Sequence, residues 1–257
     1  MNHSESLKTV LRQIRSAKQE LDSYPPTDYD WYARARDTAK LLVPWLHGTA
    51  ASLKDYVELV LNSNRQVRRL WSDIVRQFES QLPAALVYQL TKQLEHEAIL
   101  LDYVGGNVVS KVIEKHLIAT FTNGKLESNG ASDYPDLFLR SNDYTGLPTF
   151  TRRDTETFGA AMKGGRPVRV PDGLEVKTCR NGASVDCHYP HIGLHLALVF
   201  RNEEDEYIVD DVAVAFLRKD NYRITRPKTG ATTLKASFTC RDFVSLLGRH
   251  RENGPSY

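Results

Sequence analysis

Three charged side chains stand among apolar neighbours in two short segments of this chain. In "SDYPDLFLR", residues 132–140, Asp136 precedes a Leu-Phe-Leu run, and in "GLEVKTCR", residues 173–180, Glu175 and Lys177 flank a valine. Burying a charged group is costly unless the group is paired or binds an ion. Two acids and a lysine in such surroundings therefore indicate a site that does chemistry, with a buried ion-paired network as the alternative.

The chemistry that suits these residues is hydrolysis of a phosphodiester. That reaction needs positive charge near the phosphorus and an activated water molecule, and Mg²⁺ supplies both when it is held by one or two carboxylates. Both segments are typical of strands. Because successive side chains of a strand point to opposite faces, Glu175 and Lys177 should share one face, with Val176 in the core behind. We therefore expect Asp136 and Glu175, on adjacent strands, to bind Mg²⁺ and Lys177 to position the water molecule.

Pro135-Asp136 and the "EVK" that begins at Glu175 resemble the motif of the PD-(D/E)xK nuclease superfamily. The resemblance covers roughly residues 104–220 and leaves out the first hundred residues. Within the superfamily, the type II restriction endonucleases are the most similar, since they are single chains of comparable length that often carry a helical subdomain. The resemblance implies Mg²⁺ as the cofactor, double-stranded DNA as the substrate and a homodimer as the working form.

A further acid matches the same superfamily. Many members carry a glutamate on the helix that precedes the PD strand, and Glu114 in "GGNVVSKVIEKHL" occupies that place. The resemblance implies that Glu114 is an outer ligand or a ligand of a second metal ion. It also implies that the backbone carbonyl of Val176 completes the coordination by Asp136 and Glu175.

The spacing between the two acids departs from the usual pattern, because 38 residues separate Asp136 from Glu175. We interpret residues 141–172 as an inserted loop. Pro171-Asp172 is a rival for the PD motif, but it lies three positions before Glu175. Acids that share one strand or turn cannot supply ligands from two adjacent strands, so Asp136 is preferred.

Basic and polar side chains in the segments 141–172, 179–195 and 219–235 are expected to contact DNA. Arginine and lysine bind phosphates, and arginine also reads guanine edges. The predicted DNA contacts are Arg152, Arg153, Lys163, Arg166, Arg169, Arg180, Asn181, His188, His191 and Arg223.

The composition of the chain limits the classes of protein to which it can belong. Hydrophobic residues make up 41% of the 257 residues, which is ordinary for a packed globular protein. The net charge of +2 conceals six acids within residues 203–211 and a basic remainder, which gives weak support to a local DNA surface. No apolar run reaches the length of a membrane span, no signal core opens the sequence, and three cysteines favour reduced thiols. We therefore expect a cytoplasmic protein.

The order of predicted elements indicates an α/β (α+β) protein. Apolar spacing predicts a helix over residues 4–22 and a second over 28–43 that ends near Pro44, followed by further helices up to residue 101. A last helix follows Gly106. Strands are predicted at 134–140, 173–178, 194–201, 206–218 and 233–239, with "RNEEDEY", residues 201–207, as a hairpin connection and a closing helix over 241–248.

These elements predict a restriction-endonuclease-like central mixed sheet flanked by helices, with a helical N-terminal subdomain. We expect residues 1–103 to form that subdomain, which would support dimerisation or clasp DNA. Residues 104–257 would form the nuclease core with its DNA-recognition loops.

Other motifs carry less weight. "CRNGASVDCHYPHIGLHL" holds cysteines and histidines but lacks the spacing of a zinc knuckle, and His96-Glu97 lacks the second histidine of a zinc protease, since Leu100 stands there. Glycine patterns for nucleotide binding and the serine elbow are missing from the sequence. The arginines of "RQVRRLWSDIVRQFE" are interpreted as a solvated helix face, with a phosphate-tracking face as the alternative.

The sequence thus predicts a homodimeric, Mg²⁺-dependent type II restriction endonuclease that cuts a short, palindromic DNA site. Two alternatives stay open. The same core could belong to a DNA repair or junction nuclease that recognises structure rather than sequence. The chain could also be a non-catalytic DNA-binding protein with an inactive nuclease core.

Overall fold

The protein is described here by a computed structural model. The residues that it describes are 3–22, 31–78, 81–90, 92, 105–128, 135–140, 168–180, 185–187, 191–204, 206–225, 235–238 and 242–248. The predicted boundary between residues 103 and 104 lies outside these ranges, as does most of the predicted 141–172 loop. In the described part of the chain, no helix combines the length and apolar content that a membrane crossing requires.

Three helices pack around the sheet: α1 (His3–Asp22), α2 (Trp31–Phe78) and α4 (Gly105–Thr120). The helix predicted over residues 4–22 is confirmed, because Val10, Ile14 and Ala17 recur at helical spacing and are fully buried. The helix predicted after Gly106 is also confirmed and begins one residue earlier than that glycine. A short helical stretch at residues 84–90 lies between α2 and α4 along the chain.

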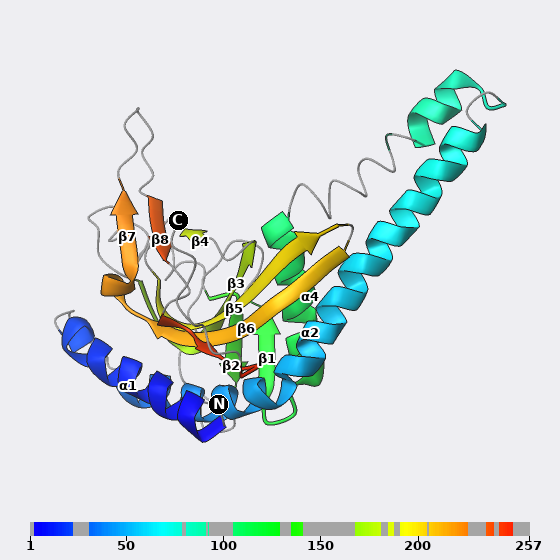
Figure 1. Ribbon diagram of the computed structural model, residues 1–257. Helices are drawn as coiled ribbons and strands as arrows, with labels where there is room; N and C mark the ends of the chain where they lie inside the picture. Colours follow the sequence, from blue (N-terminus) through cyan, green and yellow to red (C-terminus); the bar gives the residue numbers. More distant parts are fainter. Residues whose placement is uncertain are drawn as a thin grey trace.

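The predicted helix end near Pro44 is wrong, because α2 continues through this proline to Phe78. A proline inside a helix lacks the N–H that would bond to the preceding turn and costs about 3 kcal/mol. Buried side chains lie on both sides of it, among them Leu42, Leu46 and Leu53, and each stabilises the fold by roughly 1.5–3 kcal/mol. Continued burial of one apolar stripe therefore outweighs the cost of the proline. α2 also changes direction along its length (Figure 1), which is the usual effect of a proline inside a helix.

The main sheet has six strands in the order β1-β2-β3-β5-β6-β9. All neighbouring strands are antiparallel except β3 and β5, which are parallel, so the sheet is mixed as predicted. The strands are β1 (Lys125–Ser128), β2 (Leu137–Arg140), β3 (Val168–Arg180), β5 (His191–Glu203), β6 (Glu206–Leu217) and β9 (Val244–Ser245). The predicted hairpin is confirmed, since Glu203 pairs with Glu206 and Glu204 turns the chain with a φ of 51°.

A smaller antiparallel sheet has the order β4-β8-β7, with β4 (Val185–Cys187), β7 (Tyr222–Thr225) and β8 (Lys235–Phe238). A 3₁₀ turn, Lys219–Asn221, leads into β7. This sheet stands on one side of the main sheet, whereas α1 and the first part of α2 lie on the other side (Figure 1). The crossover between the parallel strands β3 and β5 passes through β4.

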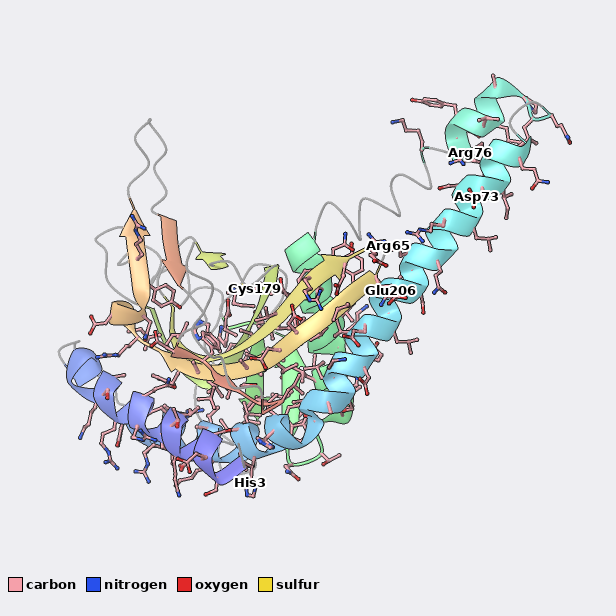
Figure 2. The ribbon with its side chains drawn as sticks, viewed as in Figure 1. His3, Arg65, Asp73, Arg76, Cys179 and Glu206 are labelled. Carbon is pink, nitrogen blue, oxygen red and sulfur yellow. The ribbon has the colours of Figure 1, made fainter. Side chains whose placement is uncertain are left out.

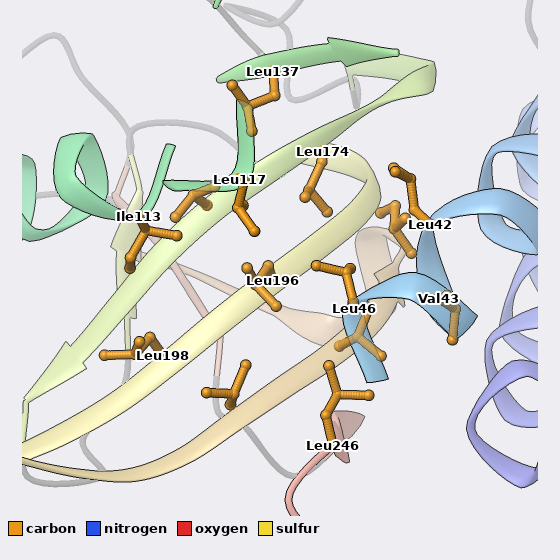
Figure 3. Packing of buried hydrophobic residues seen from close by; sticks show 14 of the residues in the cluster. Leu42, Val43, Leu46, Ile113, Leu117, Leu137, Leu174, Leu196, Leu198 and Leu246 are labelled. Carbon is orange, nitrogen blue, oxygen red and sulfur yellow. The ribbon is translucent and has the colours of Figure 1, made fainter. Parts of the chain in front are cut away.

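Each face of the main sheet has its own apolar cluster. The larger cluster joins alternate residues of β3, β5 and β6 to α1, α2 and α4, and Figure 3 shows Leu174 and Leu196 of the sheet facing Leu46 and Leu117 of the helices. The smaller cluster, on the opposite face, includes Cys179 of β3 together with residues of β5, β6 and β7. The first helices and the sheet therefore share one hydrophobic core.

Two further sequence predictions are corrected by the strands. Residues 241–248, predicted as a closing helix, contain β9, and the N–H of Leu246 donates to the carbonyl of Val212. Their short apolar run fits a helix or a strand equally well by pattern alone, and Phe243 and Val244 settle it by packing into opposite clusters. Residues 168–172, predicted as the end of a loop, are the first part of β3.

Candidate active site

Asp136 and Glu175 lie side by side on adjacent strands. β2 and β3 are antiparallel with Leu137 opposite Leu174, so the same register places Asp136, directly before β2, opposite Glu175. The backbone N–H of Asp136 donates to Glu175 Oε2 at 3.1 Å, and the N–H of Val176 donates to Asp136 Oδ2 at 2.8 Å. Each carboxylate thus accepts a hydrogen bond from the backbone of the neighbouring segment, which brings the two carboxylates close together.

The approach of the two strands depends on a proline against a glycine. A Cβ placed on Gly173 would lie 2.1 Å from Pro135 Cγ and 2.8 Å from the carbonyl oxygen of Leu137. Only a residue without a side chain leaves room for Pro135, which is buried directly before Asp136. The proline of the "PD" pair therefore packs against the glycine of "GLEVK" and sets the position of Asp136.

Lys177 lies beside the two acids. Glu175 and Lys177 are two positions apart in β3 and share a face, while Val176 is 1% exposed and belongs to the larger core cluster on the other face. The Lys177 ammonium donates to Glu175 Oε1 and forms an ion pair with it, and its side chain is 21% exposed. The predicted alternation is therefore confirmed, and an ammonium group stands next to the carboxylate pair.

Glu114 reaches the same region from α4. Its side chain is 3% exposed, and Lys111, one turn earlier on the helix, donates to both of its carboxylate oxygens at 2.8 and 2.6 Å. Burial raises the pKa of Glu114, the Lys111 ammonium opposes that rise, and the negative charge of Glu175 adds to it. These mutual effects place Glu114 within electrostatic reach of the pair formed by Asp136 and Glu175.

The pKa of Asp136 is strongly raised. Burial raises the pKa of Asp136 from 3.8 to about 7, and the neighbouring charge of Glu175 contributes to the rise. Lys177 and the N–H of Val176 lower the pKa but do not compensate for the other two effects. A cation between Asp136 and Glu175 would oppose both causes of the rise and favour the charged carboxylate.

The donor set suits a hard divalent cation. Mg²⁺ commonly binds through one or two carboxylates and keeps several water molecules, and Asp136 and Glu175 offer two such carboxylates. Within the described residues, no group of three or more His, Cys, Asp and Glu side chains is arranged to hold a metal ion. A metal ion at this site would therefore rest on the carboxylate pair, with Glu114 apart from it.

The rival acid Asp172 lies in β3 itself, on the same strand as Glu175. It therefore does not offer a ligand from an adjacent strand. The register between β3 and β5 shifts between Val170 and Leu174, and this irregular stretch accommodates Pro171, which has no N–H to donate.

Most of the predicted DNA contacts fall outside the residues whose side chains the structure describes. Arg223 is described, and it is exposed on β7. Arg169 and Arg180 lie in β3 and His191 begins β5, but their side chains are not described. The remaining predicted contacts, which lie wholly outside the described ranges, are Arg152, Arg153, Lys163, Arg166, Asn181 and His188.

The arginine-rich part of α2 extends away from the sheet, where Figure 2 shows Asp73 and Arg76 on its far portion. Arg65 donates to Asn202 Oδ1 at 2.8 Å and stacks on Tyr207, and Arg76 pairs with Asp73. These two arginines therefore make contacts within the protein.

The cysteine- and histidine-containing segment contributes a buried side chain next to the site. His195 of β5 pairs in register with Glu175 and is fully buried. Its Nδ1 contacts the carbonyl of Gly193 at 2.8 Å, and its Nε2 contacts the Tyr222 hydroxyl at 3.3 Å. Both ring nitrogens thus have protein partners, which does not favour a zinc ligand. Tyr222, which the sequence alone did not indicate, thus lies against a buried neighbour of the site.

Lys111 is a further residue of the site that the sequence alone did not indicate. Its spacing of three residues before Glu114 was the available signal, because side chains at i and i+3 are neighbours on a helix.

Comparison of the chain with known proteins gives no match: no family model, no curated protein and no solved structure matches it. Interpretation of the site therefore rests on its own residues.

Proposed function

We propose that this chain is a Mg²⁺-dependent type II restriction endonuclease of the PD-(D/E)xK superfamily. It would hydrolyse phosphodiester bonds in both strands of double-stranded DNA at a specific, short sequence. The observation that carries the proposal is the pair of reciprocal hydrogen bonds between Asp136 and β3, which holds two carboxylates together with Lys177 beside them. Burial, and then the charge of Glu175, raises the pKa of Asp136 to about 7, and a carboxyl perturbed in this way beside a second carboxylate is typical of functional sites.

Each residue has a distinct role in this proposal. Asp136 and Glu175 hold the ion together with the backbone carbonyl of Val176. When bound, Mg²⁺ neutralises charge on the phosphate and lowers the pKa of a water molecule. The ammonium of Lys177 orients the attacking water and stabilises the negative charge that develops on the phosphate oxygens. Glu114 lies outside the pair formed by Asp136 and Glu175 and affects these two carboxylates through its negative charge.

The arrangement of elements supports the finer fold assignment. A helix with an acid (α4), a strand preceded by Pro135-Asp136 (β2) and a strand that contains "EVK" (β3) follow one another along the chain, and further strands complete the sheet. This is the order that the resemblance implies. The three strands β1, β2 and β3 are antiparallel neighbours, and β5 is parallel to β3. A restriction-endonuclease-like core is consistent with this arrangement.

DNA would be bound by the side of the main sheet that carries the smaller sheet. Glu175 and Lys177 point to that side, because they alternate with the core residues Leu174 and Val176. The exposed Arg223 on β7 is one candidate contact there. A homodimer would present two such sites related by two-fold symmetry, which matches a palindromic sequence.

The proposal is tested by incubating the purified chain with Mg²⁺ and sequenced bacteriophage and plasmid DNA long enough to contain every six-base-pair sequence. The expected result is a set of discrete fragments whose ends, when sequenced, share one short motif. EDTA should abolish the fragments. The matched control is Asp136→Asn, prepared in the same way to exclude a contaminating nuclease.

Other outcomes separate the alternatives. Cleavage of four-way junctions or flaps, without discrete fragments from linear duplex DNA, would indicate a structure-specific nuclease. Binding to DNA without cleavage of any substrate, in Mg²⁺ or in Mn²⁺, would indicate a non-catalytic DNA-binding protein and would contradict the proposed activity.

Replacing Gly173 with alanine is expected to lower the cleavage rate by roughly 10²-fold and the free energy of unfolding by about 1–3 kcal/mol. The added methyl group would collide with Pro135 and the carbonyl of Leu137, so β2 must move and carry Asp136 with it. Initial cleavage rates and urea unfolding measure the two effects. Gly48→Ala is the control, since a Cβ there meets nothing within 4 Å and α2 should gain about 0.5–1 kcal/mol. Unchanged cleavage by the Gly173 variant would show that this contact does not position Asp136.

A further inference from the structure

The ion pair between Lys111 and Glu114 joins side chains of very different exposure. The Lys111 side chain is 41% exposed, whereas that of Glu114 is 3% exposed. The ammonium nevertheless contacts both carboxylate oxygens, at 2.8 and 2.6 Å. A cation that bonds both oxygens of a buried carboxylate occupies the place where a metal ion would bind that carboxylate.

The charges of the site bear on the number of metal ions that it can bind. Three acids and two lysines are gathered there: Lys177 forms an ion pair with Glu175, and Lys111 forms one with Glu114. Asp136 accepts a hydrogen bond from the backbone N–H of Val176 and also feels the positive charge of Lys177. These five charges sum to −1, and a single divalent cation beside Asp136 would bring the sum to +1, whereas a second cation at Glu114 would add two more positive charges or have to displace Lys111.

We propose that Lys111 is a built-in counter-ion of Glu114 that takes the place of a second divalent cation, so that the site binds one divalent cation per chain. This inference rests on the proposed metal-dependent activity, since it concerns the stoichiometry of the same site. It assigns Lys111 a positioning role: it holds Glu114 and limits the number of ions, without touching the reacting atoms.

The geometry of α4 favours the ion pair between Lys111 and Glu114. Lys111 and Glu114 are one turn apart on α4, so the ammonium remains close to the carboxylate even when it moves. A second ion would have to compete with this high local concentration of positive charge and also shed part of its water. Mg²⁺ gives up water reluctantly, which favours the lysine further.

The test measures Mn²⁺ binding to the full chain by isothermal titration calorimetry in the absence of DNA. The wild-type chain is expected to bind one ion. Lys111→Met, which keeps the aliphatic contacts and removes the charge, should bind two. The double variant Lys111→Met with Glu114→Gln should return to one ion, because the second position then lacks its carboxylate.

Lys115→Met is the matched control. Lys115 is exposed on the same helix, and its replacement changes the net charge of the chain by the same amount. It should leave the stoichiometry at one, which excludes a general electrostatic effect. Lys111→Gln provides a second test should the methionine variant fold poorly, because it keeps a hydrogen-bond donor near Glu114 without the charge; it too should bind two ions.

Each outcome decides a separate question. Two ions in the wild-type chain, or one ion in a folded chain with Met or Gln at position 111, would overturn the role of Lys111 while leaving the metal-dependent activity intact. A wild-type chain that binds no ion would contradict the proposed function itself and this inference with it. Thermal melting gives a second readout, since Mn²⁺ should raise the melting temperature of Lys111→Met more than that of the wild-type chain.

Discussion

Replacing Lys177 with alanine is expected to lower the rate of DNA cleavage by about 10²–10⁴-fold, while the affinity for DNA in Ca²⁺ changes little. The ammonium of Lys177 lies on Glu175, beside the position proposed for the attacking water. Its loss removes a charge that acts on the transition state more strongly than on bound DNA. Single-turnover cleavage and a filter-binding assay measure the two quantities separately.

The control for this variant addresses folding and charge. Lys125→Ala removes an exposed lysine of β1 that pairs with Glu127, and it should cleave like the wild-type chain. Lys177→Ala leaves the buried Glu175 without this counter-ion. For that reason thermal melting is used to establish that the variant is folded. Cleavage that persists at the wild-type rate in a folded Lys177→Ala chain would reject the role assigned to this lysine.

Asp136→Asn is expected to abolish detectable cleavage and, in the absence of divalent cations, to make the fold more stable at pH 8. The amide can still accept the hydrogen bond from the N–H of Val176 but is a far weaker ligand for a hard cation. The gain in stability arises because the amide carries no charge that must be buried next to Glu175. Loss of activity with a gain in stability is typical of a functional rather than a structural residue.

The pH dependence of that gain follows from the raised pKa. In the folded chain Asp136 keeps its proton up to about pH 7, whereas the unfolded chain loses it near 3.8. The folded state therefore binds more protons between these values, and the stability of the wild-type chain falls as the pH rises from about 4 to 7. The full shift would correspond to roughly 4 kcal/mol, and we expect about 1–3 kcal/mol at pH 8 because water and ions reach part of the site.

Urea unfolding in EDTA at pH 4.5 and pH 8 measures this difference. The stability advantage of Asp136→Asn should be small at the lower pH and largest at the higher pH. Asp73→Asn, which alters an exposed aspartate far along α2, should show no such trend. A variant at position 136 that still cleaves DNA, or that gains no stability at pH 8, would argue against a buried, cation-binding Asp136.

Much of the fold follows from local patterns in the sequence. The helix at 4–22 is predicted because Val10 and Ile14 repeat at helical spacing, and the hairpin connection at 201–207 is predicted because a polar segment separates two predicted strands. The sequence predicts a helix end near Pro44 because proline is a strong local signal for the end of a helix. The burial that allows α2 to continue depends on contacts with strands that are distant in the sequence. The sequence predicts a helix over residues 241–248 because a short apolar run is compatible with a helix as well as with a strand. The run alone does not show whether its side chains are buried on one face or on both.

The placement of Glu175 and Lys177 on one face could be predicted because successive side chains of a strand point to opposite faces. The placement of Asp136 beside Glu175 was expected because the two acids were assigned to adjacent strands, and the register shows that these strands, β2 and β3, are antiparallel neighbours. Lys111 could not be assigned in the same way, because its role depends on the burial of Glu114. The pairing of Gly173 with Pro135 likewise becomes visible only when the two strands are brought together.

The most direct test of the central claim is a crystal structure of the chain soaked in Mn²⁺, with the ion located by its anomalous scattering. We predict one strong peak per chain, within roughly 2–2.6 Å of a carboxylate oxygen of Asp136 and of one of Glu175. An empty position between these carboxylates at saturating Mn²⁺, or a peak that contacts neither of them, would contradict the claim that this pair holds the ion for phosphodiester hydrolysis.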